Sequence, residues 1–103
     1  MPKSPPPSKN QINPQKKAVS LEYSGQGAPI VSAKGTGLMA EQILQLAKEN
    51  DIPVMQDVEL TALLEQVELN DEIPDVLYEA VAQVLIFAYE MSGKSFPTIA
   101  PKD

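Results

Sequence analysis

The apolar residues of this 103-residue chain change their spacing along the sequence, and this change restricts the fold more than any other feature. Val19, Leu21 and Tyr23 alternate with other residues, which is the period of a β-strand with one buried face. From Leu38 onward the apolar residues recur every three or four positions, which is the period of an amphipathic helix. The sequence therefore predicts a domain that contains both strands and helices.

Turn residues between these segments predict the first four elements. Residues 18–23 and 29–33 are expected to form a β-hairpin, because the segment between them has the glycine-rich chemistry of a turn. A helix is predicted over 38–50, followed by a short strand over 52–56. This strand-helix-strand order predicts that the third strand runs parallel to the second.

Two more helices are expected in the second half. Asp57 is placed to cap one of them, and Pro74 to open a longer one that ends near Gly93. A wide apolar arc predicts that the last helix packs on more than one side, since it includes Ile86, Phe87 and Tyr89. The predicted fold class is α/β of the α+β type, with a mixed sheet of about three strands flanked by about three helices.

Charge is distributed unevenly along the chain. Met1 to Lys17 carries four Lys and no acid, whereas Ala18 to Asp103 carries four Lys and fourteen acids. Residues 1–16 contain five of the ten prolines and are expected to be a disordered, basic, Pro-rich tail. Residues 17–92 are expected to form the folded domain, and residues 93–103 a flexible C-terminal tail.

The composition excludes several classes of function. The net charge of −6 argues against a nucleic-acid partner, because such proteins collect cations on one face. Without Cys or His the chain lacks a thiolate nucleophile, a classical zinc site and a histidine base, so no cofactor is expected. The eight acids between Asp57 and Glu79 include no calcium-loop spacing, so no metal is expected either. No apolar stretch is long enough to span a bilayer, so we expect a cytoplasmic protein without direct membrane insertion.

One dipeptide carries a specific chemistry. In Asn13-Pro14, the Asn amide can attack its own main-chain carbonyl and break the chain before Pro14, provided that a strained turn holds this geometry. Most Asn-Pro pairs only start turns. The pair is therefore a candidate site of self-cleavage, with the turn as the structural alternative.

Five collinear segments resemble a known family. They are Asn13–Tyr23, Gly27–Gly35, Leu46–Val54, Val67–Pro74 and Leu77–Leu85. In this order and spacing they resemble the C-terminal cytoplasmic domain of the flagellar export protein FlhB and its type III secretion relatives. The resemblance implies a small mixed sheet flanked by helices, and a role in choosing which substrates are exported.

The resemblance also implies a cleavage loop, in which this chain departs from the family. The family's Asn-Pro-Thr-His loop cleaves itself between Asn and Pro, whereas Gln15 and Lys16 follow Asn13 and Pro14 here. We expect no catalytic residue in this degenerate motif, because the His that could assist proton movement is missing. The chain is expected to be non-enzymatic, with an autoproteolytic switch at Asn13-Pro14 as the alternative.

The resemblance further implies a route of action. In the family, the strand before the cleavage loop pairs with the strand that matches Lys17 to Tyr23. We therefore expect an open sheet edge at that strand, and docking by strand addition on a truncated FlhB stub at the export gate. The chain would then replace the C-terminal fragment of FlhB in the switch of substrate specificity, peripherally at the inner membrane. A soluble module that binds only export substrates is a second alternative.

Four positions match the family's shallow apolar patch for export signals. They are Ala28 and Pro29 in the hairpin, and Ala82 and Leu85 in the last helix. All four are ordinary core residue types, so the structural alternative is that they are simply buried.

Overall fold

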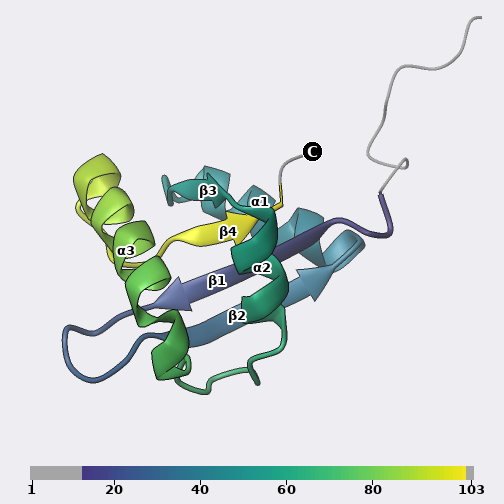
Figure 1. The fold of residues 1–103 in the computed structure, drawn as a ribbon. Coiled ribbons are helices and arrows are strands. Elements are labelled where there is room, and N and C mark those ends of the chain that lie inside the picture. Colours follow the sequence, from purple (N-terminus) through teal and green to yellow (C-terminus); the bar gives the residue numbers. More distant parts are fainter. Residues whose placement is uncertain (1–12, 102–103) are drawn as a thin grey trace, which may run out of the picture.

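The computed structural model describes residues 13–101, which form a four-stranded mixed sheet with helices packed on it (Figure 1). The strand order across the sheet is β2-β1-β4-β3. Strand β1 is antiparallel to β2 and to β4, whereas β3 and β4 are parallel. The strands are β1 (Lys17–Glu22), β2 (Ile30–Thr36), β3 (Val54–Gln56) and β4 (Thr98–Ala100). The predicted α+β fold with a mixed sheet is confirmed, with one more strand than expected.

The α-helices of residues 13–101 follow the predicted pattern. They are α1 (Leu38–Glu49), α2 (Val58–Glu65) and α3 (Tyr78–Ser92), and the 3-10 turn η1 (Asp75–Leu77) leads into α3. Asp57 caps α2, since its Oδ1 accepts a hydrogen bond from the main-chain N–H of Leu60 at 2.9 Å. Gly93 ends α3 with a φ of 73°, a left-handed conformation that glycine adopts without steric cost.

The helices cover opposite faces of the sheet. In Figure 1, α1 lies behind β1 and β2, whereas α2 and α3 lie in front. The alternation in β1 places Val19 and Leu21 in the same buried cluster as Val81 of α3. On the other face α1 approaches the sheet closely, and a Cβ on Gly35 would lie 2.6 Å from the Cβ of Met39. Gly35 is therefore required by close packing.

The C-terminal segment differs from the prediction. The sequence predicts a flexible tail over 93–103, but the three residues of β4 are at most 4% exposed. Ile99 is paired with Val19 of β1 on one side and with Met55 of β3 on the other. The tail prediction is wrong for this strand, because three residues between two prolines show no recognisable period and proline favours a loop.

Strand β4 also occupies the sheet edge that was expected to be open. Within the described residues, β1 has β2 on one side and β4 on the other. The contact extends beyond the strand, because the main-chain N–H of Leu21 donates to the carbonyl oxygen of Pro97 at 2.9 Å. The hydroxyl oxygens of Ser20 and Thr98 lie 3.1 Å apart. The prediction of an open edge at β1 is therefore wrong, and strand addition there would require β4 to leave.

Strand β3 runs in the predicted direction but does not lie beside β2. The successive pairings make β2 and β3 parallel to each other. However, β1 and β4 lie between them. A strand-helix-strand unit sets the direction of its second strand, whereas its place in the sheet depends on which other strands insert.

The outer surface of α3 also differs from the prediction. Val84 and Ala88 are buried, but Ile86 and Tyr89 are 57% and 64% exposed. Part of the wide apolar arc therefore faces solvent rather than a second packing partner. None of the helices described within residues 13–101 is both long and apolar enough to cross a membrane.

The described chain begins with an ordered turn. Residues 1–12, most of the predicted basic tail, lie outside the described residues, as do residues 102–103. The main-chain N–H of Lys16 donates to the carbonyl oxygen of Asn13 at 3.1 Å. The main-chain N–H of Gly37 donates to the carbonyl oxygen of Lys16 at 2.7 Å. The turn over residues 13–16 is thus attached to the loop before α1, and the ordered domain begins before the predicted boundary at Lys17.

Candidate functional site

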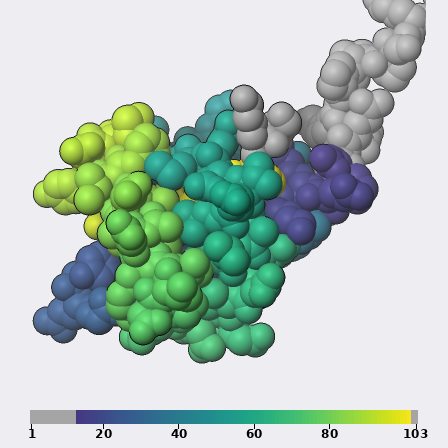
Figure 2. Space-filling view, in the orientation of Figure 1, coloured from purple at the N-terminus to yellow at the C-terminus, as the bar shows by residue number. Residues whose placement is uncertain are grey.

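A groove opens between the β1–β2 loop and helix α3. Figure 2 shows this loop, in blue, beside the green surface of α3. The groove has a volume of about 340 Å³, within the range of ligand sites in proteins. None of its lining residues is charged: Tyr23, Gly27, Ala28, Pro29, Ile73, Tyr78, Val81, Ala82, Leu85 and Ile86. Chemically, it suits an apolar side chain.

One wall is formed by the start of β2 and the segment that precedes α3. The main-chain N–H of Ile73 donates to the carbonyl oxygen of Pro29 at 2.9 Å. Val31 accepts a hydrogen bond from the N–H of Asn70 at 2.7 Å, and donates one to the carbonyl oxygen of Asp71 at 3.1 Å. These main-chain bonds fix the position of Pro29 and Ile73 relative to each other, so this wall is preformed.

The loop reaches the groove through a glycine turn. Gly27 has a φ of 73°, which residues with a Cβ rarely adopt. A Cβ at this position would lie 3.5 Å from Oε2 of Glu72, so the Glu72 carboxylate stands at the edge of the groove. The loop therefore brings Gly27 and the Glu72 carboxylate together at one end of the groove, whose lining residues are uncharged.

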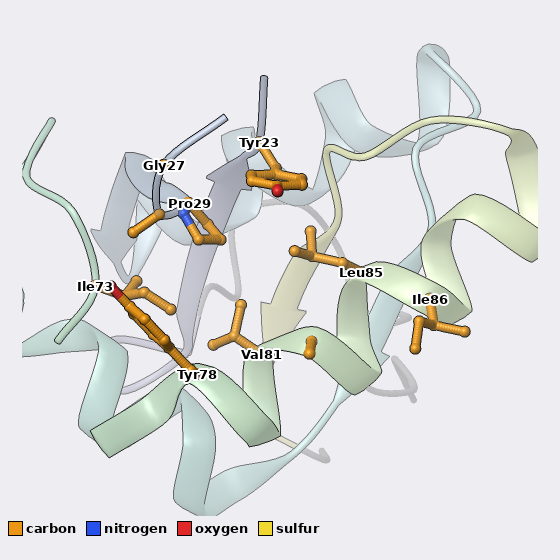
Figure 3. Close-up of a pocket in the computed structure, with 10 residues that line it drawn as sticks. Tyr23, Gly27, Pro29, Ile73, Tyr78, Val81, Leu85 and Ile86 are labelled. Carbon is orange, nitrogen blue, oxygen red and sulfur yellow. The ribbon is translucent and has the colours of Figure 1, made fainter. Parts of the chain in front are cut away.

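Helix α3 provides the opposite wall. Figure 3 shows Val81 and Leu85 on α3 facing Tyr23 and Pro29 across the groove. Val81 is fully buried and belongs to the core, whereas Leu85 is half-buried and packs against that core. The groove floor is thus continuous with the hydrophobic core, which holds it in shape.

The structure brings together all four residues that the resemblance assigned to a patch. Ala28, Pro29, Ala82 and Leu85 all line the groove. Pro29 is buried, Ala28 and Leu85 are half-buried, and Ala82 is exposed. The four residues therefore lie together at the edge of the core, where some close the core and others reach solvent.

The two tyrosines of the groove were not predicted from the sequence as site residues. Tyr23 follows the last residue of β1, and Tyr78 opens α3. Tyr23 was assigned only to the apolar face of a strand. An aromatic residue at the end of a strand, in a chain that has only three Tyr and two Phe, is the signal that could have identified it.

The degenerate cleavage motif lies at the other end of β1 from the groove. The Oδ1 of Asn13 accepts a hydrogen bond from the main-chain N–H of Gln15 at 2.9 Å, as in an Asx turn. Lys16 forms an ion pair with Glu41 at 3.4 Å. Asn13, Pro14 and Gln15 are exposed. The four residues form an ordered turn and are not part of the groove.

The acids between Asp57 and Glu79 do not converge. In residues 13–101, no three carboxylates gather in an arrangement that could hold a metal ion.

Known proteins are similar to about three quarters of this chain. Residues 12–88 match the model of the FlhB HrpN YscU SpaS family. The uncharacterized protein YlqH of Bacillus subtilis (strain 168) is 39% identical over 80 residues, which cover 76% of this chain and 86% of YlqH. The flagellar biosynthetic protein FlhB of Escherichia coli (strain K12) is 38% identical over 82 residues, which cover 77% of this chain but 22% of FlhB.

The same likeness holds in three dimensions. The crystal structure of a mutated EscU C-terminal domain matches with a TM-score of 0.68 and 33% sequence identity. The match covers 73% of this chain and 94% of that domain. This chain therefore spans most of YlqH and of the EscU domain, but less than a quarter of FlhB.

Proposed function

Because the chain belongs to the FlhB HrpN YscU SpaS family, we propose that it is a non-enzymatic, cytoplasmic interaction module of flagellar or type III protein export. It binds export substrates in the groove and stands in for the C-terminal fragment of FlhB when substrate specificity switches. One observation carries this proposal. Residues from two distant parts of the sequence, which the resemblance assigns to substrate recognition, line one uncharged and partly open groove.

The size of the groove indicates weak and reversible binding. Full burial of one Val, Leu or Phe side chain contributes about 1.5–3 kcal/mol. A groove that takes one or two such side chains gains at most about 6 kcal/mol before the cost of association, so we expect dissociation constants no tighter than tens of micromolar. Such affinity suits a component that meets many substrates and releases each of them.

Replacing Ala82 by Asp is expected to weaken peptide binding by at least about tenfold, because a charge would enter an apolar site. Ala82 is exposed, so the thermal unfolding midpoint should stay close to that of the unchanged protein. The measurement is fluorescence anisotropy with labelled peptides that span flagellar export substrates. The matched control is Gln83→Asp, an exposed neighbour outside the groove, which should alter affinity by less than about twofold. Equal effects of the two variants would contradict the proposal.

We propose export-gate proteins as the second class of partner. Docking on a truncated FlhB stub by simple addition of a strand to β1 is not supported, because β2 and β4 cover both sides of β1. Co-purification from cells tests the partner class directly. Recovery with the membrane-bound gate supports the proposal, whereas recovery with free export substrates alone indicates a soluble substrate-binding module instead.

We expect the chain to stay uncleaved between Asn13 and Pro14. No His follows the pair, and the Asn13 side chain is already engaged in the turn through its Oδ1. Intact-mass spectrometry after prolonged incubation should show one species that begins at Met1. A fragment that begins at Pro14 would establish the autoproteolytic alternative.

A further inference from the structure

The segments that form the groove carry negative charge only. Residues 18–33 and 66–93 contain no Lys, Arg or His. Four acids that stand within four residues of a lining residue along the chain are called here the acidic rim: Glu72, Asp75, Glu79 and Glu90. All four are exposed, and none forms an ion pair with a cation among residues 13–101. The uncharged groove is therefore bordered by carboxylates that lack a neutralising partner in the described structure.

Each rim residue stands close to a lining residue along the backbone. Glu72 precedes Ile73, and its Oε2 lies 3.5 Å from the position of a Cβ on Gly27. In α3, Glu79 lies one helical turn before Ala82, and Glu90 lies one turn after Ile86. Asp75 lies one turn of η1 before Tyr78.

Helix electrostatics explains only part of this arrangement. Asp75 and Glu79 stand at the start of η1 and α3, where acids complement the helix dipole. Glu90 lies in the last turn of α3, where an acid is unfavourable, and Glu72 lies outside any helix. These two positions are not accounted for by helix stability.

The rim also argues against a second copy of this chain as the occupant. In a two-fold symmetric dimer the same surface meets itself, so both acidic rims would face each other. A partner with positive charge beside its apolar side chain avoids this repulsion. Screening limits the useful distance to about 8 Å at physiological salt, which is about two residues of an extended peptide.

We propose that the groove selects apolar peptide segments that carry Lys or Arg within two residues of the inserted apolar side chain, and disfavours segments flanked by Asp or Glu. This inference rests on the proposed function, because it specifies the ligand of the same groove. Glu72 supplies the charge at the loop end, and Glu79 and Glu90 supply it along α3.

Three peptides with one apolar core and different flanks test the proposal. The flanking residues are Lys, Ser or Glu, and affinity is measured by fluorescence anisotropy at about 50 mM and about 500 mM NaCl. We expect the Lys-flanked peptide to bind on the order of tenfold more tightly than the Ser-flanked peptide at low salt, with a smaller ratio at high salt. The Glu-flanked peptide should bind most weakly.

Removing single charges from the acidic rim identifies which carboxylates cause the preference for Lys-flanked peptides. Glu72→Gln should lower the ratio of the affinity for the Lys-flanked peptide to the affinity for the Ser-flanked peptide by roughly two- to fivefold. The control is Glu49→Gln on α1, which lies on the opposite face of the sheet and should change neither affinity. If all three peptides bind equally and Ala82→Asp weakens all of them, the charge preference is wrong but the groove remains the peptide site. If no peptide binds, the proposed function itself fails.

Discussion

Replacing Ile99 by Asp is expected to unfold the domain. Ile99 is fully buried in the core cluster, and its strand joins β1 to β3. An ionised carboxylate at this buried position would have no partner, so the free energy of unfolding would fall by more than about 4 kcal/mol. A domain of this size lies near the lower end of the range of about 5–15 kcal/mol for the free energy of unfolding, so this loss removes most of its stability. The measurement is urea unfolding followed by circular dichroism.

Ile99→Ala provides a graded version of this test, with an expected loss of about 2–5 kcal/mol. The control is Val76→Asp, because Val76 is 80% exposed and should change stability by less than about 0.5 kcal/mol. The result matters for function, since β4 occupies the position beside β1 where a partner strand was expected. A folded Ile99→Asp variant would mean that β4 is dispensable and that the edge of β1 can open.

Replacing Lys34 by Met is expected to destabilise the domain by about 2–3 kcal/mol. The Lys34 Nζ donates to the main-chain oxygen of Glu65 at 2.9 Å and to that of Val67 at 2.7 Å. Glu65 is the last residue of α2, so these carbonyls lack partners within the helix. Met keeps most of the side-chain length but removes every donor. Two carbonyls in a half-buried site would then have to find water.

Lys17→Met is the matched control, since Lys17 also reaches Glu65. Its Nζ forms an ion pair with the carboxylate Oε1 at 3.1 Å, and the two side chains are 40% and 30% exposed. A partly solvated pair of this kind contributes at most about 1 kcal/mol. Urea unfolding should therefore show that Lys34→Met lowers the free energy of unfolding clearly more than Lys17→Met does. Equal losses would show that the carbonyl contacts contribute no more than an exposed ion pair.

The candidate site could be predicted only in part. Resemblance pointed to Ala28, Pro29, Ala82 and Leu85, but their residue types alone are those of any core. Six further residues complete the groove, among them Tyr23, Tyr78 and Ile86, and none of the six was assigned to it from sequence. Ile86 was expected to pack against a second partner, whereas it is largely exposed. Exposure depends on which surfaces meet in the folded chain, and residue type does not report this.

The family resemblance also left part of the fold undetermined. Residues 12–88 match the family model, whereas β4 lies beyond them at residues 98–100. Nothing in that match predicts that the chain would supply its own strand between β1 and β3. The expectation of an open edge at β1 was therefore wrong, although the domain around it was recognised correctly.

The sequence by itself determined the local elements of this protein. The alternation at Val19 and Leu21, the cap at Asp57 and the stop at Gly93 act through sterics and hydrogen bonds between near neighbours, so they can be read directly. The tertiary structure decided which strand lies beside β1 and which apolar residues stay at the surface. Ile99 becomes core only when β1 and β3 lie on either side of it, and Ala82 becomes part of a groove only when the β1–β2 loop lies opposite. Such outcomes depend on contacts between distant segments, which no local pattern encodes.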